Sequence, residues 1–387
     1  MITKLPEKSL MMDDDGDSLL IRIIDSYEDF MHLENDWNRL ISKNSEASFF
    51  STFSFIRVAW EHCRRKTDRL FVLLVKRDEE IVGVAPFRRQ VRRLGRLSFR
   101  VIRFIDWDTD RPGIITIENE EVIWKRIYYF FNYEFNEWDI IDLMEQPSHW
   151  NILRQKFYHN KRYLYKSEPE TTSYYVSTNG RWKDYIKNRN RDVRKNFKKR
   201  KKKLHLLSED VNCQCFDDPA IIGDALERFF SVEQSGWKRG ADFSIAGNEA
   251  RKKFYKSLII ELARKSMVSI YLLQCGEEDI AAKIIFKCNN ICYSAHTAYR
   301  LSYSKYSPGT LLLAEIIKTL FENEYKELDL LGMRLEYGKQ QAKLDWATGS
   351  RQTVRVEIYK ITLRLVLYIL YARFLKFRTI FMNWCKY

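Results

Sequence analysis

The sequence predicts a mixed α/β fold arranged as two tandem domains. A chain of 387 residues is longer than one typical domain and fits two of ordinary size. Segments with the apolar period of strands alternate with segments of helical period almost throughout. In the second half, helices precede three closely spaced strands, and a further helix and strand follow. This order indicates a mixed, largely antiparallel sheet flanked by helices, and not a doubly wound parallel sheet.

Apolar alternation bounded by turn residues defines the expected strands. They lie at 19–24, 70–75, 81–86, 101–105 and 138–143 in the first half, and at 206–216, 268–274, 280–287, 291–299, 328–331 and 354–361 in the second. Helical spacing of apolar residues defines the expected helices. They lie at 25–41, about 53–60, 122–133, 181–203, 219–238, 248–265 and 307–323.

These elements divide the chain into two halves. We expect a disordered N-terminus over 1–17, where three consecutive aspartates precede the first apolar stretch. The first domain is placed at 18–175 and the second at 176–360. Residues 361–387 combine large apolar and basic side chains, and predict an amphipathic C-terminal helix. That helix either lies on a membrane surface or docks on the second domain.

The cysteines and the N-terminal residues indicate a reducing compartment. The seven cysteines are odd in number and scattered, and none has the spacing of a metal ligand set, so we expect reduced thiols and no metal site. The first residues lack the pattern of a secretory signal, and no apolar run is long enough to span a bilayer. The expected location is therefore cytoplasmic, with peripheral association at the inner membrane face as an extension.

Most of the positive charge lies in one segment. The net charge is +14, and residues 181–203 hold thirteen Lys and Arg against two Asp, which is +11. The apolar residues of this helix follow steps of 4, 7, 4 and 7, which predicts one packed seam with cationic faces around it. They are Trp182, Ile186, Val193, Phe197 and Leu204. Three interpretations stay open: a solvated face, a contact with anionic lipid or polymer, and a contact with nucleic acid such as tRNA.

The segment from Ser307 to Thr310 is the first candidate site. Pro308 suits the first turn of a helix, and Gly309 lets a bulky group approach the backbone. Free N–H groups at Thr310 and beyond would lie at the positive end of the helix dipole, which is a receptor for pyrophosphate or carboxylate. The alternative is an ordinary helix with Ser307 as its cap.

The strand at 291–299 precedes this loop. Regular alternation would place Cys292, Ser294, His296 and Ala298 on one small, polar face that suits a ligand lying along the strand. A neutral His296 there could accept a proton from an incoming ammonium. The alternative is a structural histidine held by hydrogen bonds.

Several motifs in this half resemble those of the CelD-type acetyltransferase family, a branch of the GNAT superfamily related to the FemAB peptidyltransferases. The motif residues are His296, Ala298, Tyr299, Tyr303, Ser307, Pro308, Gly309 and Leu312; Glu233, Ser235, Trp237, Lys238 and Gly240; Gly276, Ile280, Ala281 and Ala282; and 328–332 with 343–346. Ala342 stands where the family has tyrosine, with Tyr337 upstream. Matching residues in the first half extend the resemblance over about 20–360.

The resemblance implies two tandem GNAT-like domains and transfer of an acyl group from acetyl-CoA or another acyl-CoA to an amine. It implies His296, Glu233, Asp329 and Tyr337 as acid–base candidates. Ser307, Pro308, Gly309, Thr310 and Lys343 would bind the donor, and Trp237 and Lys238 would line the acceptor pocket. The implied acceptor is an amino sugar or a cell-envelope glycan precursor. Two alternatives remain: a FemAB-like transferase that uses aminoacyl-tRNA, and a non-catalytic binding module.

Overall fold

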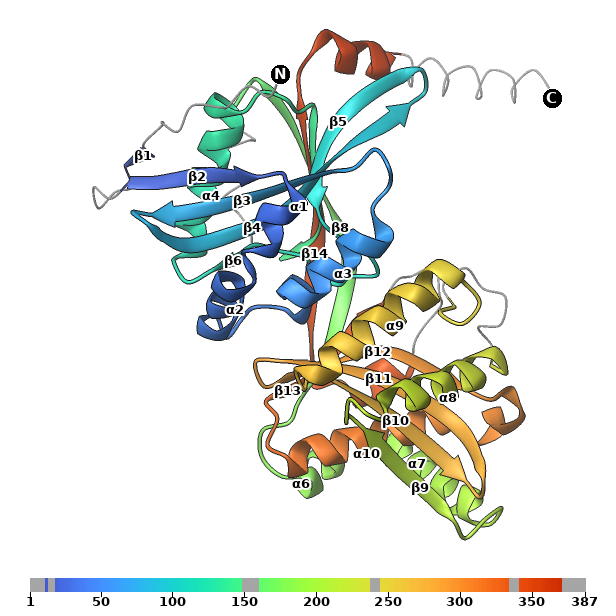
Figure 1. The fold of residues 1–387 in the computed structure, drawn as a ribbon. Helices are drawn as coiled ribbons and strands as arrows, with labels where there is room; N and C mark the ends of the chain where they lie inside the picture. Colours follow the sequence, from blue (N-terminus) through green and yellow to red (C-terminus); the bar gives the residue numbers. More distant parts are fainter. Residues whose placement is uncertain (1–10, 13–17, 148–159, 237–243, 334–340, 371–387) are drawn as a thin grey trace, which may run out of the picture. The chain divides into compact units, whose positions relative to one another are not determined.

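The computed structural model describes residues 11–12, 18–147, 160–236, 244–333 and 341–370 (Figure 1). Their contacts divide the chain into two units. Unit 1 comprises Met1–Ser45, Arg65–Glu170 and Thr353–Tyr387, and unit 2 comprises Glu46–Arg64 and Thr171–Gln352. The units are interleaved in the sequence, unlike the contiguous halves that the sequence predicts.

Unit 1 is a mixed sheet with helices. Its strands are β2 (Ser18–Ile24), β3 (Arg69–Arg77), β4 (Glu80–Leu94), β5 (Leu97–Phe104), β7 (Ile140–Pro147) and the second part of β14 (Gly349–Lys360), in this spatial order. The short strands β1 (Met11–Met12) and β6 (Ile115–Thr116) pair with β2 and β4. Its helices are α1 (Tyr27–Met31), α2 (Glu34–Lys43), α4 (Glu120–Tyr129) and the π-helical turn η2 (Phe130–Glu134).

Unit 2 has a sheet of the same kind. Its strands are β9 (Val211–Phe216), β10 (Val268–Cys275), β11 (Glu278–Cys288), β12 (Ile291–Tyr299), β13 (Glu327–Met333) and the second part of β8 (Tyr163–Ser177), in this spatial order. Its helices are η1 (Phe49–Ser51), α3 (Phe53–Cys63), α6 (Trp182–Lys187), α7 (Arg191–His205), α8 (Ile222–Gln234), α9 (Glu249–Arg264), η3 (Leu301–Tyr306), α10 (Pro308–Glu322) and α11 (Gln341–Trp346).

The two sheets share one topology. In each, the first four strands pair antiparallel, the fourth and fifth pair parallel, and a sixth strand pairs antiparallel with the fifth. In each, a helix pair follows the first strand and one helix connects the fourth and fifth strands. The units are therefore structural repeats of each other.

Residues 46–64 belong to unit 2 because of an aromatic cluster. The ring of Phe49 stacks on Phe286 of β11 at 4.3 Å, and Phe55 of α3 meets Phe254 of α9 edge to face at 6.0 Å. Aromatic pairs of this geometry add to the free energy gained by burial. The sequence predicts an aromatic stretch followed by a helix here, and the structure has both. The pattern of apolar residues alone does not show which sheet the segment covers.

Most predicted elements are confirmed, and three of the differences concern the longer elements. The helix expected at 25–41 is two helices, α1 and α2, and the basic helix at 181–203 is broken between α6 and α7. Its predicted seam is nevertheless confirmed, since Leu204 is buried and the other four apolar residues pack against the same core. Strand β8 has no counterpart in the prediction, because the stretch from Lys166 to Thr172 is polar and charged and lacks an apolar period.

Candidate functional site

The parallel strands β12 and β13 separate soon after they begin. Among the described residues they pair only at Ile291, Cys292 and Tyr293, opposite Glu327, Leu328 and Asp329. Beyond this point β12 stays paired with β11 up to Tyr299, and β13 stays paired with β8 up to Met333. Within the described residues, the inner edge of β12 therefore offers backbone N–H and C=O groups to a ligand, as an open sheet edge does to an added strand.

A β-bulge at Ala295 re-aims the side chains that follow. Ile284 pairs with His296 and Ile285 pairs with Ser294, so Ala295 is the extra residue. The register places His296 on the face of Tyr293, while Ser294, Thr297 and Tyr299 share the other face. The expectation that His296 shares a face with Cys292 and Ser294 is therefore wrong, because regular alternation fails at the bulge.

The bulge turns His296 towards α9. The hydroxyl of Tyr255 lies 2.5 Å from Nε2 of His296, and the two rings meet edge to face at 4.8 Å. Tyr255 is buried, whereas His296 is partly exposed. A hydrogen bond to one ring nitrogen fixes the ring plane and the tautomer of a histidine, which is how a base is held in position.

The start of α10 lies against the other face of β12. A Cβ atom on Gly309 would be 3.4 Å from Cγ2 of Thr297 and 3.5 Å from the Tyr299 ring. Ser307 has a left-handed backbone and its side chain makes no cap bond, so the ordinary serine cap is not what the structure has. The carbonyl of Ser307 accepts bonds from the N–H groups of Thr310 and Leu311. The first turn therefore has fewer free donors than the sequence predicts.

Lys283 supplies positive charge at this place, and the sequence analysis missed it. It lies on β11 with only 4% of its surface exposed, and its ammonium is 2.5 Å from Oγ1 of Thr297. Thr297 is also the residue nearest to Gly309. A buried cation and the positive end of a helix dipole thus lie on one face of the sheet. The signal was a lone lysine inside the apolar run 280–286.

Three other predicted residues hold backbone segments. Glu233 is buried, and its Oε2 accepts bonds from Oγ of Ser244 and from N of Ala246. Asp329 accepts from the N–H of Leu331, and Lys343 donates to the carbonyls of Leu331 and Gly332. The structure therefore brings Asp329 and Lys343 together at the end of β13. Trp237, Lys238 and Tyr337 lie outside the described residues, as do 1–10, 13–17 and 371–387.

Cysteine side chains near the site do not offer a nucleophile. Burial raises the pKa of Cys292, on β12, to about 12 and that of Cys288, on β11, to about 11. At neutral pH both thiols stay protonated, and a thiol attacks carbonyl carbon only as thiolate. Tyr303, in the loop before α10, also keeps its proton, since its hydrogen bond to Glu278 raises its pKa to about 12. The residues the structure describes contain no cluster of metal-ligating groups.

Gly236 lies where α8 approaches the end of β12. At the end of α8, a Cβ on this residue would lie 2.6 Å from the carbonyl oxygen of Tyr299, closer than real Cβ contacts allow. The Ser235 carbonyl also accepts a bond from the N–H of Leu301. The chain therefore needs glycine where α8 meets the end of β12.

We expect Gly236→Ala to lower the free energy of unfolding by roughly 1–3 kcal/mol, as overpacking does. The measurement is chemical denaturation. Gly223→Ala is the matched control, since nothing lies within 4 Å of the Cβ position there. Equal stability of wild type and Gly236→Ala would contradict the close approach.

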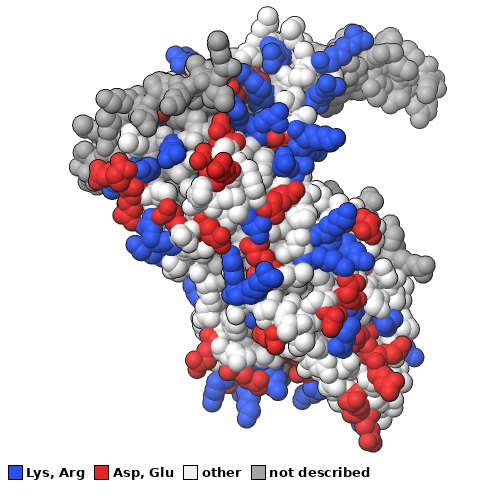
Figure 2. All heavy atoms as spheres, in the orientation of Figure 1, with Lys and Arg blue, Asp and Glu red and all other residues white. Residues whose placement is uncertain are grey.

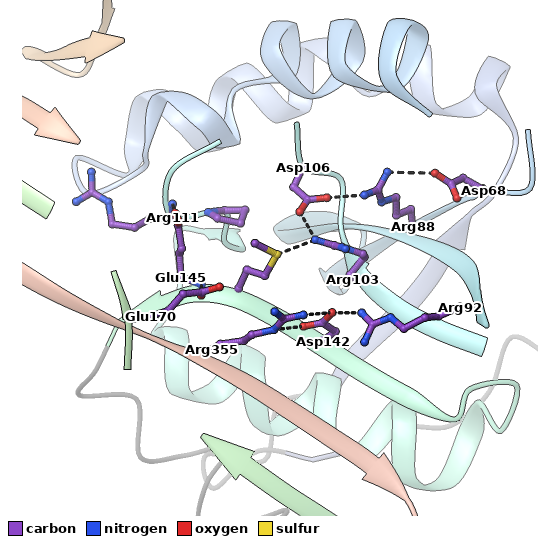
Figure 3. A network of polar contacts seen from close by, with 12 residues as sticks. Asp68, Arg88, Arg92, Arg103, Asp106, Arg111, Asp142, Glu145, Glu170 and Arg355 are labelled. Atoms are coloured by element: carbon purple, nitrogen blue, oxygen red, sulfur yellow. Dashed lines mark hydrogen bonds and ion pairs between the residues drawn. The ribbon is translucent and has the colours of Figure 1, made fainter. Parts of the chain in front are cut away.

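The corresponding place in unit 1 has different chemistry. Strands β5 and β7 also separate after a short parallel pairing, at Val101–Ile140 and Ile102–Ile141. The connecting helix α4, however, begins with Glu120 and Glu121, which oppose an anion. Beyond the pairing the structure has a network of arginine and acidic side chains (Figure 3). Unit 2 is therefore the unit whose opening suits an anionic donor.

Comparison with known proteins agrees with this assignment. Residues 191–341 match the family model of the acetyltransferase (GNAT) domain. We call this stretch the GNAT segment; it runs from α7 to the start of α11 and lies wholly within unit 2. Together with the shared topology of the units, the match confirms the predicted fold class of two tandem GNAT-like α/β domains. Among proteins with curated functions, none matches the sequence.

Solved structures share the fold at low sequence identity. FemX is 10% identical with a TM-score of 0.58, over 87% of this chain and 98% of that one. L-PGS from Bacillus licheniformis is 10% identical with a TM-score of 0.53, over 88% and 96%. The C-terminal domain of a putative lysylphosphatidylglycerol synthetase from Agrobacterium fabrum is 8% identical with a TM-score of 0.52, over 89% and 96%.

Proposed function

We propose that the protein is a GNAT-type N-acyltransferase of the CelD-like kind, which moves an acyl group from acyl-CoA to an amine on an amino sugar or glycan precursor. The observation that carries the proposal is the early separation of β12 from β13 inside the GNAT segment. The open edge of β12 suits the amide-bearing arm of CoA. The positive end of the α10 dipole and the ammonium of Lys283 suit the negative charge of its pyrophosphate.

The reaction fits direct attack by the acceptor amine. The amine nitrogen forms a bond to the thioester carbonyl carbon, the carbon–sulfur bond breaks, and the CoA thiolate leaves. His296, held by Tyr255, takes the proton that the amine must lose. Backbone N–H groups on the edge of β12 stabilise the oxyanion of the tetrahedral intermediate. No covalent enzyme intermediate is needed, in keeping with the protonated thiols of Cys288 and Cys292.

Calorimetric titration with acetyl-CoA and longer acyl-CoAs tests the proposal. We expect wild type to bind, and Gly309→Trp to lose binding, because the indole would fill the space beside Thr297 and Tyr299. Gly223→Trp is the matched control, since this glycine also lies in the first turn of a helix but faces open space. Absence of binding to every acyl-CoA would overturn the proposal.

One observation favours a second candidate, a transferase that uses aminoacyl-tRNA. Helix α7 exposes Lys195, Lys198, Lys199, Lys202 and Lys203 on the outside of unit 2. Phosphate contacts from such a row would bind RNA with a steep dependence on salt. Tight, salt-sensitive binding of tRNA, together with no binding of acyl-CoA, would support this candidate over the first.

A further inference from the structure

The helix over 363–370, which follows β14 in unit 1, has two apolar faces. One face is packed: Leu365 is buried against Phe99, Val101 and Ile140, and the ring of Tyr368 lies 5.8 Å from that of Phe99. These contacts fix the helix on β5 and β7. The described part of the predicted C-terminal helix therefore packs on unit 1 through its inward face.

The outward face is an apolar stripe. Its members recur at helical spacing and are strongly exposed: Leu363 by 76%, Val366 by 42%, Leu367 by 49% and Leu370 by 57%. Ile361, just before the helix, is 50% exposed. Single exposed leucines are ordinary, but four at positions i, i+3, i+4 and i+7 form a continuous patch that implies a partner.

Arginines border this stripe. Arg364 donates to the carbonyl of Ser98, and the strand partner of Ser98 is Arg93 on β4. Arg93, Arg96 and Arg100, on the β4–β5 hairpin, are exposed. Figure 2 shows Lys and Arg gathered at the top of the view, where this hairpin and the helix lie. Burial lowers the pKa of Lys360; repulsion from Arg100 and Arg162 adds to this shift, and attraction to Asp139 opposes it.

We propose that helix 363–370 and the β4–β5 hairpin form a docking surface for an anionic lipid bilayer. An apolar stripe beside arginines is the arrangement that inserts into the headgroup boundary and pairs with acidic headgroups. The exposed stripe is aliphatic, whereas single-stranded nucleic acid is held by stacking on aromatic rings. A second copy of the chain would bring the same arginines face to face across a twofold axis, which is unfavourable. No helix among the described residues is long and apolar enough to cross a membrane.

Co-sedimentation of the full chain with vesicles tests the surface, independently of acyl-CoA binding. We expect binding to vesicles that contain phosphatidylglycerol and weak binding to phosphatidylcholine alone. The double variant Leu363→Asp, Leu367→Asp should lower the partition coefficient by roughly tenfold or more, since two apolar anchors become charged. Arg93→Glu with Arg96→Glu should remove the preference for anionic lipid. These side chains are exposed, so unchanged thermal melting would confirm that the variants fold.

Matched controls lie on unit 2. Leu206→Asp changes a leucine that is 77% exposed at the end of α7, and Lys198→Glu with Lys199→Glu reverses charges on α7. Both controls should bind vesicles as wild type does. Loss of binding in the controls with retention in the helix variants would overturn the proposal and assign lipid binding to α7. Failure to bind anionic vesicles, with self-association abolished by the leucine variant, would instead assign the stripe to a second copy.

Discussion

Replacing Asp142 with alanine is expected to lower the free energy of unfolding by about 3–5 kcal/mol, the cost of leaving buried charges without their counterion. The side chain of Asp142 on β7 is fully buried and lies between two arginines (Figure 3). Arg355 of β14 donates twice to its carboxylate, at 2.9 Å each, and Arg92 of β4 pairs with it. Its removal would leave both guanidinium groups with the more distant carboxylate of Glu357, 3.7 Å from Arg92 and 3.9 Å from Arg355.

Chemical denaturation of Asp142→Ala and Asp142→Asn measures the effect. Asparagine keeps the shape and a hydrogen-bond acceptor, so the alanine variant should be the less stable of the two. Glu79→Ala is the matched control. The Glu79 side chain is 98% exposed, so loss of its ion pair with Lys76 should leave the melting temperature unchanged. A loss below about 1 kcal/mol in Asp142→Ala would show that water reaches the network and replaces the carboxylate.

The same residue predicts a dependence of stability on pH. Burial by itself would raise the pKa of Asp142, but hydrogen bonds and positive charge from Arg355, aided by Arg103 and Arg92, outweigh it and lower the pKa. The folded-state pKa thus lies below that of the unfolded chain, about 3.9. The stabilisation is complete above pH 4 and is lost as the pH falls through the folded-state value. Asp142→Asn should therefore lose less stability than wild type on acidification below pH 4.

The periodic spacing of apolar residues along the chain was enough to predict the fold class and most helices and strands. The strands of unit 2 and helix α10 each bury one continuous face, and such segments carry a strong periodic signal. The strand that completes the sheet of unit 1 was not predictable in this way. Strand β14 follows unit 2 in sequence but completes the sheet of unit 1 beside β7, and that pairing is a long-range contact with no local sign.

The motif residues lead to the end of β12 and the start of α10, and that location stays a prediction. The structure differs from the sequence analysis in the geometry of the side chains there. The face of His296 was predicted wrongly, because the bulge at Ala295 depends on the register with β11 and leaves no mark in the pattern of residue types. Lys283 was overlooked because no nearby residue in the sequence indicates a partner for it. Its hydrogen-bond partner, Thr297, lies on the neighbouring strand β12. Both omissions concern cross-strand geometry.

His296→Ala is expected to lower kcat by roughly 10²–10⁴-fold, the usual contribution of a general base. Its binding of acyl-CoA should be unchanged, because the start of α10 lies on the opposite face of β12. In wild type, kcat/KM should rise with pH as the imidazole loses its proton. This rise, the acidic limb of the pH profile, should be absent in the variant. His205→Ala is the matched control, since His205 is an exposed histidine at the end of α7.

Tyr255→Phe separates proton transfer from structure. The ring keeps its edge-to-face contact with His296 but loses the hydroxyl at Nε2, so the pH limb should shift while the protein stays folded. If His296 is a base positioned by the hydrogen bond from Tyr255, both variants should alter the pH profile. The change should be smaller in Tyr255→Phe than in His296→Ala. If His296→Ala lowered only thermal stability and kept the pH profile of wild type, His296 would be a structural residue. Proton removal would then belong to another group or to water.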